Sequence, residues 1–413
     1  MGLSPGRRDR AVRRASDLCF DAVQDPRRRK KRQYSLAGLL GLITAGLASQ
    51  KLLLRDLEAF GSDLSLDMLR RLGLKRAPSD TTFWEVIADL KPTGFREALY
   101  AQIRDDLDAK AITNDLFRGG VLTLDGKTTG SGMGEAPTDA VRQSVCDSEG
   151  TKCWNAYALR GCLSSSSARP VLDQEFIKTK GHESPSFRVV VARLVKQFPK
   201  LFRYLTVDAG MTSAENAHSV REWGKHYLFA LKMNFKRLFK AAQTLTAGLE
   251  PVAVTTERAG GCLVRRELRR ARVGAECNYR DGTEYWNVRQ VKTDADGRVT
   301  VENRFYITSI PVDELSDAEC LGLVRLHWGI ENGPNWTADV IFKEDDHTPC
   351  AAGNGVLIMA WLRSLAYNLL SVFRAHLPQK DRRLERWRRA AELLRDALVF
   401  GAVEVSEFPV LPV

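Results

Sequence analysis

The sequence predicts an α/β protein with a mixed sheet and helices on both of its faces. The prediction rests on the order of elements after Val121, which reads strand, strand, strand, helix, strand, helix, strand. It also rests on two apolar runs that each end on an aspartate, Val121–Leu124 before Asp125 and Arg203–Val207 before Asp208. Aliphatic and β-branched runs of this length favour buried strands. This order of elements is that of a ribonuclease H-like core.

The composition indicates a globular, basic protein. Its 413 residues include 44% hydrophobic side chains, which is enough for a large core in about two or three domains. The formal net charge of +11 predicts an acidic partner, first of all nucleic acid, although a solvated basic surface has the same composition. Eight scattered cysteines without a Cys-x-x-Cys pair argue against a zinc site and indicate free thiols in a reducing cytosol.

The first part of the chain divides into an arm and a helical domain. Residues 1–33 are Arg-rich and predict a basic flexible arm, which either lies along phosphates or is a disordered tail. Residues 34–110 carry apolar side chains at helical spacing, so we expect either a helix-turn-helix-like DNA-binding module or helical packing support for the next domain. The apolar run Leu36–Ala48 is too short to span a bilayer and predicts a buried helix.

The central domain, residues 115–380, carries the predicted sheet. Lys152–Arg160 and Val171–Lys178 follow the first strand as two further strands, and Ser186–Gln197 predicts an amphipathic helix. Thr212–Glu215 has the spacing of a capping box, so a second helix should begin there, before the last strand of the core.

A segment at about 235–310 does not fit the core order and predicts an inserted β-rich subdomain. Its alternating, β-branched runs are Val252–Thr256, Cys262–Val264 and Val299–Val301. Arg265 and Arg266 begin a dense basic strip, which predicts either phosphate contact or an edge strand protected by charge. Residues 381–413 predict a basic C-terminal helix and tail.

A third acid lies on a predicted helix. Ser316–Glu319 has capping-box spacing, and the helix that it starts carries Glu331 near its end. His327, Trp328 and Glu331 fall on one face at helical spacing. Gly333-Pro334 should kink or end this helix, a break that would loosen Glu331.

Asp125, Asp208 and Glu331 together predict a minimal site for two Mg²⁺ ions, which Mn²⁺ would replace. Ligand sites in α/β sheets lie at the carboxyl ends of strands, although an Asp that merely opens a turn has the same local sequence. Two such cations can stabilise both the attacking and the leaving oxygen of a phosphoryl displacement, and Asp125 would bridge them. Asp339 and Glu344 are acids close by in sequence, and they either assist Glu331 or lie behind the site or on the surface.

Several stretches are more specific than three separate acids. They are Asp25–Arg27, Arg76–Trp84, Leu124–Lys127, Val207–Ala209 and, above all, His327–Asn332 followed by Trp336, Asp339-Val340, Phe342 and Glu344-Asp345. Over nearly the whole chain, these stretches resemble the H-repeat-associated branch of the DDE insertion-sequence transposases, relatives of the insertion-sequence As-type enzymes. The wider class carries Tyr, Arg and Lys around the Glu, where this chain has Val324, His327 and Ala338.

The resemblance implies strand transfer at the ends of a mobile element, with Asp125, Asp208 and Glu331 as the metal-binding triad. It implies double-stranded DNA as the partner, both terminal inverted repeats and target DNA, and a prokaryotic cytoplasmic, nucleoid-associated setting without a membrane. Because transposition brings two ends together, we expect a dimer on DNA. The side chains predicted to contact DNA are Lys127, His327, Arg325, Arg265 and Arg266. Two alternatives stay open, a catalytically silent DNA-binding remnant and a nuclease on the same core without strand transfer.

Overall fold

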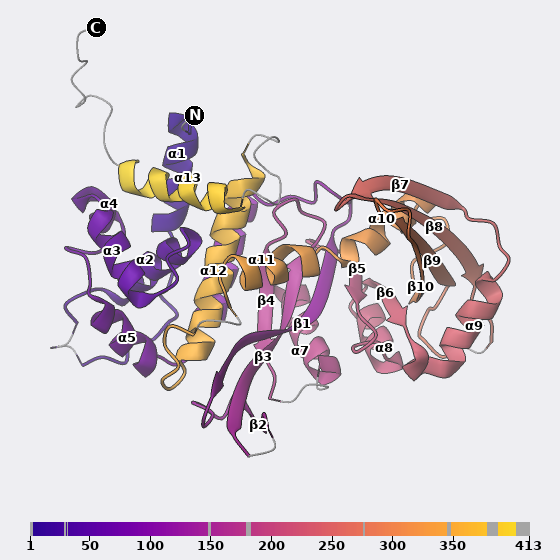
Figure 1. The fold of residues 1–413 in the computed structure, drawn as a ribbon, viewed down its shortest axis with the longest axis horizontal. Coiled ribbons are helices and arrows are strands. Elements are labelled where there is room, and N and C mark those ends of the chain that lie inside the picture. The colour runs from indigo at the N-terminus through magenta and orange to yellow at the C-terminus, as the bar shows by residue number, and fades with distance from the viewer. Residues whose placement is uncertain are drawn as a thin grey trace, which may run out of the picture.

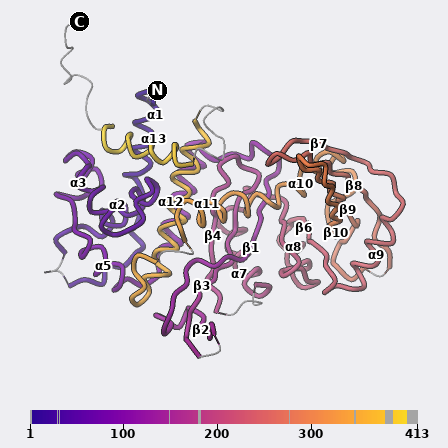
Figure 2. Tube along the Cα trace, viewed as in Figure 1, coloured from indigo at the N-terminus to yellow at the C-terminus, as the bar shows by residue number. Residues whose placement is uncertain are grey.

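The computed structural model describes residues 3–28, 30, 32–147, 150–178, 183–275, 277–344, 348–377 and 387–401. A helical N-terminal region lies at one end of the molecule, and the first strands of the sheet lie in the middle (Figure 1). The strands after about residue 250 form the opposite end, as the chain trace also shows (Figure 2).

The N-terminal region is all-helical, as predicted. Its helices are α1 (Pro5–Ser16), α2 (Leu36–Ala48), α3 (Leu54–Asp63), α4 (Leu66–Arg71), α5 (Asp80–Asp89) and α6 (Phe95–Asp108). The hydroxyls of Ser35, Ser65 and Ser79 cap the starts of α2, α4 and α5. Helix α1 corrects the prediction of a flexible arm over part of its length, because Arg14 of α1 pairs with Asp106 of α6 at 2.7 Å.

The core of the sheet has the strand order β4-β3-β1-β5-β6. Its strands are β1 (Val121–Met133), β3 (Lys152–Leu163), β4 (Val171–Phe176), β5 (Tyr204–Val207) and β6 (His226–Leu231). Strands β1, β3 and β4 pair antiparallel, whereas β1, β5 and β6 run parallel. This order and these directions confirm the predicted ribonuclease H-like sheet. A short strand that was not predicted, β2 (Arg142–Val145), pairs with the first residues of β3.

The predicted β-rich insertion is present and continues the core sheet. Its elements are a 3-10 turn (Met233–Phe235), α9 (Lys236–Thr246), β7 (Ala253–Ala259), β8 (Cys262–Arg272), β9 (Glu284–Thr293) and β10 (Val299–Thr308). β10 pairs antiparallel with β6, with Phe305 opposite Leu231, so one ten-stranded sheet runs through both parts of the described chain. The Arg-rich strip lies on β8, which has β7 on one side and β9 on the other and is therefore not an edge strand.

Two helices connect the parallel strands, as the sequence predicts. They are α7 (Glu183–Gln197), which packs against β3 and β4, and α8 (Ala214–Glu222), which packs against β6. The hydroxyl of Ser213 accepts a hydrogen bond of 3.0 Å from the N–H of Asn216 and caps α8. After the insertion come α10 (Asp317–His327), a π turn (Glu331–Asn335), α11 (Trp336–Val340), α12 (Gly355–Ala375) and α13 (Trp387–Phe400).

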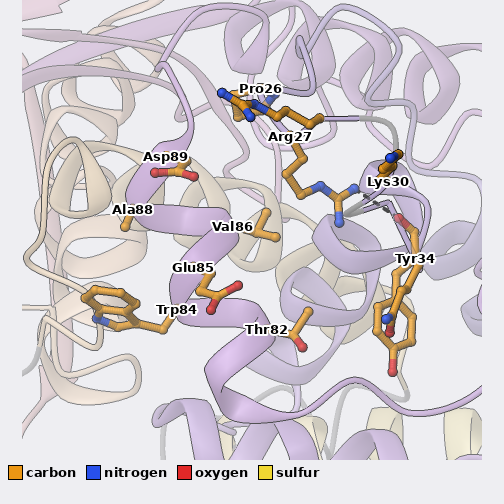
Figure 3. A pocket seen from close by; sticks show the side chains of 12 residues that line it. Pro26, Arg27, Lys30, Tyr34, Thr82, Trp84, Glu85, Val86, Ala88 and Asp89 are labelled. Carbon is orange, nitrogen blue, oxygen red and sulfur yellow. Dashed lines mark hydrogen bonds between the residues drawn. The ribbon is translucent and has the colours of Figure 1, made fainter.

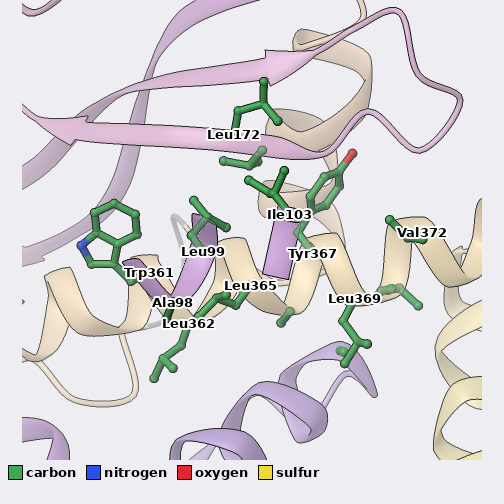
Figure 4. Close-up of a cluster of buried hydrophobic side chains, with 14 of the residues drawn as sticks. Ala98, Leu99, Ile103, Leu172, Trp361, Leu362, Leu365, Tyr367, Leu369 and Val372 are labelled. Carbon is green, nitrogen blue, oxygen red and sulfur yellow. The ribbon is translucent and has the colours of Figure 1, made fainter. Parts of the chain in front are cut away.

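Helix α12 joins the N-terminal helices to the sheet (Figure 4). It is buried along nearly its whole length and packs against α2, α6 and β4. The amide of Asn368 makes two hydrogen bonds, of 2.8 and 2.9 Å, with the backbone of Val171 in β4. By length and composition alone α12 could cross a bilayer, but it lies inside the protein. Because α2 is buried against α12, the N-terminal region supports the sheet, and its contact with DNA stays a prediction.

Candidate active site

Asp125 and Asp208 come together because their strands are parallel neighbours. In the β1–β5 pairing Leu124 lies opposite Val207, so each strand carries an aspartate at the next position and at the same level of the sheet. Asp208 directly follows β5, as predicted. Asp125 does not end its strand, because β1 continues to Met133. Asp125 lies where the parallel strand β5 stops, so β5 no longer pairs with that edge of β1.

Glu331 is the first residue of the π turn that follows α10. The predicted capping box is present, since Ser316 and Glu319 each accept a hydrogen bond from the backbone N–H of the other. The predicted helix is shorter than expected and ends at His327, before Glu331 is reached. Glu331 itself is exposed.

The chain stays helical past Gly333-Pro334, which corrects the expected break. In an α-helix the carbonyl of Ile330 would accept from the N–H of residue 334, but proline has none. That carbonyl instead accepts from the N–H of Asn335, at 3.1 Å. One residue is thereby added to the turn, which is the definition of a π turn, and α11 continues directly from it.

Asp208 and Glu331 both lie within electrostatic reach of Asp125. Burial in the first place, and then the charges of Asp208 and Glu331, raise the pKa of Asp125 from its ordinary value of 3.8 to about 6. Hydrogen bonds of 2.9 Å from the Gly126 N–H and from the Asn335 amide oppose that rise. Bound cations would relieve this repulsion between like charges.

The donor chemistry of the three carboxylates fits hard divalent cations, which prefer oxygen ligands. In the described part of the chain, no group of three or more His, Cys, Asp or Glu side chains is gathered closely enough to hold a metal ion as placed. A cavity of about 300 Å³ opens beside Asp208 and Glu331, and Lys232, Arg304 and Trp328 also line it. Three carboxylates, of Asp208, Glu302 and Glu331, and two cationic side chains therefore share one cavity, and Glu302 pairs with Arg304 at 2.7 Å. Cations and carboxylates side by side suit a phosphodiester beside bound metal ions.

A larger groove, of about 930 Å³, lies in the N-terminal region (Figure 3). Basic side chains of the segment before α2, among them Arg28 and Lys30, line one part of it, and Trp84 and Glu85 of α5 line another. None of the three predicted acids lies there, so we place the candidate active site at the smaller cavity.

A chain of polar side chains behind Asp125 was not predicted. The Asn335 amide donates to Asp125, and its oxygen accepts from Arg160 at 3.4 Å. Arg160 in turn donates to both carboxylate oxygens of Glu344 at 3.3 Å, and both of these side chains are almost fully buried. Arg160 lies directly opposite Asp125 in the β1–β3 register, so the pairing of these two strands is the signal that would have found it.

The two further acids considered from the sequence are therefore both engaged. Glu344 is held by Arg160, and Asp339 forms an ion pair with Lys127. Another carboxylate lies near the site instead, because Glu183 accepts a hydrogen bond of 2.9 Å from the hydroxyl of Tyr157. Burial, Glu183 and the charges of the two aspartates raise the pKa of Tyr157 above its ordinary range.

The side chains predicted to contact DNA are differently exposed. Lys127 is buried and paired with Asp339, and His327 is only 7% exposed. Burial lowers the pKa of His327 to about 4, so the ring is neutral at pH 7. Arg266 is 9% exposed, whereas the side chains of Arg265 and Arg325 are 52% and 40% exposed. Their contact with DNA stays a prediction, and the two exposed arginines are the ones that a phosphate can reach as placed.

Trp328 links the inserted strands to the Glu331 segment. The guanidinium of Arg304 on β10 lies 4.6 Å from the centre of its ring, and that of Arg266 on β8 lies 5.6 Å away. Arg266 and Arg325 both pair with Glu257 of β7, at 2.7 and 2.5 Å. Cation–π contacts and ion pairs thus hold the insertion against the segment that carries the third acid.

Comparisons with known proteins identify the family of the chain. The family model described as Transposase DDE domain matches residues 138–369, and the DDE_Tnp_1-associated model matches residues 18–102. The chain is 25% identical over 387 residues to the protein YbfL and 24% identical over 389 residues to the H repeat-associated candidate transposase YhhI, both of Escherichia coli strain K12. Each alignment covers 87% of this chain and 92% of the relative. A cryo-EM structure of the piggyBac transposase synaptic complex with hairpin DNA matches with a TM-score of 0.44 and 13% identity, over 98% of this chain and 82% of that one.

Proposed function

The chain belongs to the transposase DDE domain family, and from this membership we propose that it is a DNA transposase that cuts the ends of an insertion sequence and joins them to target DNA. The observation that carries the proposal is that Asp208 and Glu331 line one cavity and that their charges both act on Asp125. Burial and the charges of two acids from separate elements raise the pKa of the third acid, Asp125, as expected for a site that holds cations.

Asp125, Asp208 and Glu331 would hold Mg²⁺, or Mn²⁺ in its place. When bound, such ions lower the pKa of a water or of a DNA 3′-hydroxyl and stabilise the leaving oxygen. Side chains of the protein would bind the DNA itself. Lys232 and Arg304 line the cavity and would hold a phosphate of the DNA next to the acids.

The partner in this proposal is double-stranded DNA, first the terminal inverted repeats and then the target. The net charge of +11 supports it, because a basic surface releases counterions from the phosphate backbone. Both ends must be held together, so the active form would be at least a dimer on DNA, in the nucleoid of a prokaryotic cytoplasm. The exposed arginines Arg265 and Arg325 would contribute to this contact.

A cleavage and joining assay on DNA that carries the element's own ends tests the proposal. We expect Asp125→Asn to abolish end cleavage in Mg²⁺ and in Mn²⁺ while binding to the same DNA is kept. Asp63→Asn, at an exposed position of α3, is the matched control and should cleave like the unchanged protein.

Three outcomes would contradict the proposal in different ways. If Asp125→Asn cleaved as well as the unchanged protein, the assignment of the metal-binding triad would be wrong. End-specific binding by the unchanged protein without any nicking would show a silent DNA-binding remnant. Cleavage without joining would show a nuclease that uses the same core.

A further inference from the structure

We propose that Asn335 is a positioning residue, which fixes the Asp125 carboxylate and ties it to the segment that carries Glu331. This inference rests on the proposed function, since it concerns how the same site is assembled. Nothing in the local sequence points to it, because Asn335 and Asp125 lie 210 positions apart in the chain.

The hydrogen bonds determine the orientation of the Asn335 amide. Arg160 can only donate, so the Asn335 oxygen must face its guanidinium, at 3.4 Å. The amide nitrogen must then point the other way, where it donates to Oδ2 of Asp125 at 2.9 Å. Arg160 is itself held by both oxygens of the buried Glu344, so the amide is oriented by a rigid partner.

Both oxygens of Asp125 are thereby held by hydrogen bonds from different directions. Oδ1 accepts from the Gly126 N–H within its own strand, and Oδ2 accepts from Asn335 in the π turn. The first bond comes with the strand, whereas the second depends on the π turn being in place. A carboxylate held at both oxygens keeps its remaining lone pairs in one direction, which is how residues behind a metal site orient its ligands.

Pro334 determines the position of Asn335. Because residue 334 has no N–H, the Ile330 carbonyl bonds to Asn335 and the turn gains a residue. Glu331 and Asn335 are the two ends of that same turn. The Gly333-Pro334-Asn335 sequence therefore connects the third acid to the first one, where the sequence alone suggested a break.

The experiment compares three variants of the full-length chain. Asn335→Ala removes the donor to Asp125. Asn332→Ala is the matched control, because Asn332 is an exposed asparagine of the same turn whose amide donates to the Trp328 carbonyl and does not contact an acid. Pro334→Ala restores the missing N–H, so the α-helical bond to Ile330 can form again and compete with the bond from Asn335.

Mn²⁺ binding is measured by calorimetric titration without DNA, together with end cleavage as a function of Mn²⁺ concentration. We expect Asn335→Ala to weaken Mn²⁺ binding by about 10- to 100-fold and to raise the Mn²⁺ concentration for half-maximal cleavage by a similar factor. Its affinity for end DNA, in a gel shift, should equal that of the unchanged protein and of Asn332→Ala.

Pro334→Ala separates positioning from plain stabilisation. Replacing a helix-interior proline by alanine normally stabilises a protein. We expect Pro334→Ala to unfold at the same or a higher urea concentration and yet to bind Mn²⁺ more weakly than the unchanged protein. This variant also keeps the test valid if Asn335→Ala fails to fold.

The results distinguish a failure of this inference from a failure of the proposed function. If the unchanged protein binds Mn²⁺ and cleaves, and Asn335→Ala and Pro334→Ala match it in Mn²⁺ affinity, the positioning role is refuted while the triad stands. If the unchanged protein neither binds Mn²⁺ nor cleaves, the proposed function itself fails.

Discussion

Replacement of Asp125 by Asn should stabilise the metal-free protein at neutral pH, although it removes the proposed activity. The reason is that the folded protein disfavours the charged form of this carboxyl. Burial and the neighbouring acids raise its pKa from 3.8 to about 6, and a rise of this size corresponds to about 3 kcal/mol.

The sign of the pH dependence follows from the raised pKa. A group whose pKa is higher in the folded than in the unfolded state contributes stability that is complete below the unfolded value of 3.8. This contribution is lost as the pH rises through about 6. The uncharged asparagine has no such dependence. The unfolding free energy of the unchanged protein minus that of Asp125→Asn should therefore fall by roughly 1.4 kcal/mol between pH 5 and pH 8.

Urea denaturation in the presence of a chelator, at pH 5, 6, 7 and 8, measures this difference. Asp63→Asn, at an exposed helix end, serves as the control. Addition of Mg²⁺ at pH 8 should reverse the order, because a cation at about 1,000 times its Kd stabilises the unchanged protein by about 4.1 kcal/mol and the variant by much less. Parallel pH profiles for the unchanged protein and Asp125→Asn, or an equal response to Mg²⁺, would refute the electrostatic reasoning.

Three further changes test the surroundings of the site. Glu344→Gln should lower the unfolding free energy in urea by about 3–5 kcal/mol, because it leaves the buried Arg160 charge without its partner, and a loss near zero would contradict this. Burial lowers the pKa of His327 from 6.5 to about 4. The unfolding free energy of the unchanged protein should therefore fall by up to about 3 kcal/mol relative to that of His327→Gln as the pH falls from 7 to 4. A constant difference between the two proteins would speak against burial of a neutral ring. Trp328→Ala removes the ring beside Arg304 and should reduce stability by at least about 1 kcal/mol and end cleavage more than DNA binding, whereas equal losses of both would place the ring in the DNA contact instead.

Local patterns in the sequence were sufficient to predict most of the helices and strands and to propose the three acids. The β-branched run before Asp208 and the capping box at Ser316 involve neighbouring residues, so their physical causes can be read from short stretches. The family resemblance came from such stretches as well. Family membership and the ribonuclease H-like sheet are both confirmed, while the triad of acids stays a proposal.

Only the tertiary structure decided how the site is assembled. Asp125 lies within a long strand and owes its open side to the shorter neighbour β5, which depends on strand pairing. The contacts of Asn335 with Asp125 and Arg160 depend on the register of β1 and β3 and on one extra residue in a turn. A hydrogen bond between residues 210 positions apart leaves no periodic signal in the sequence, because its geometry is set by how separate elements pack rather than by what adjoins each residue.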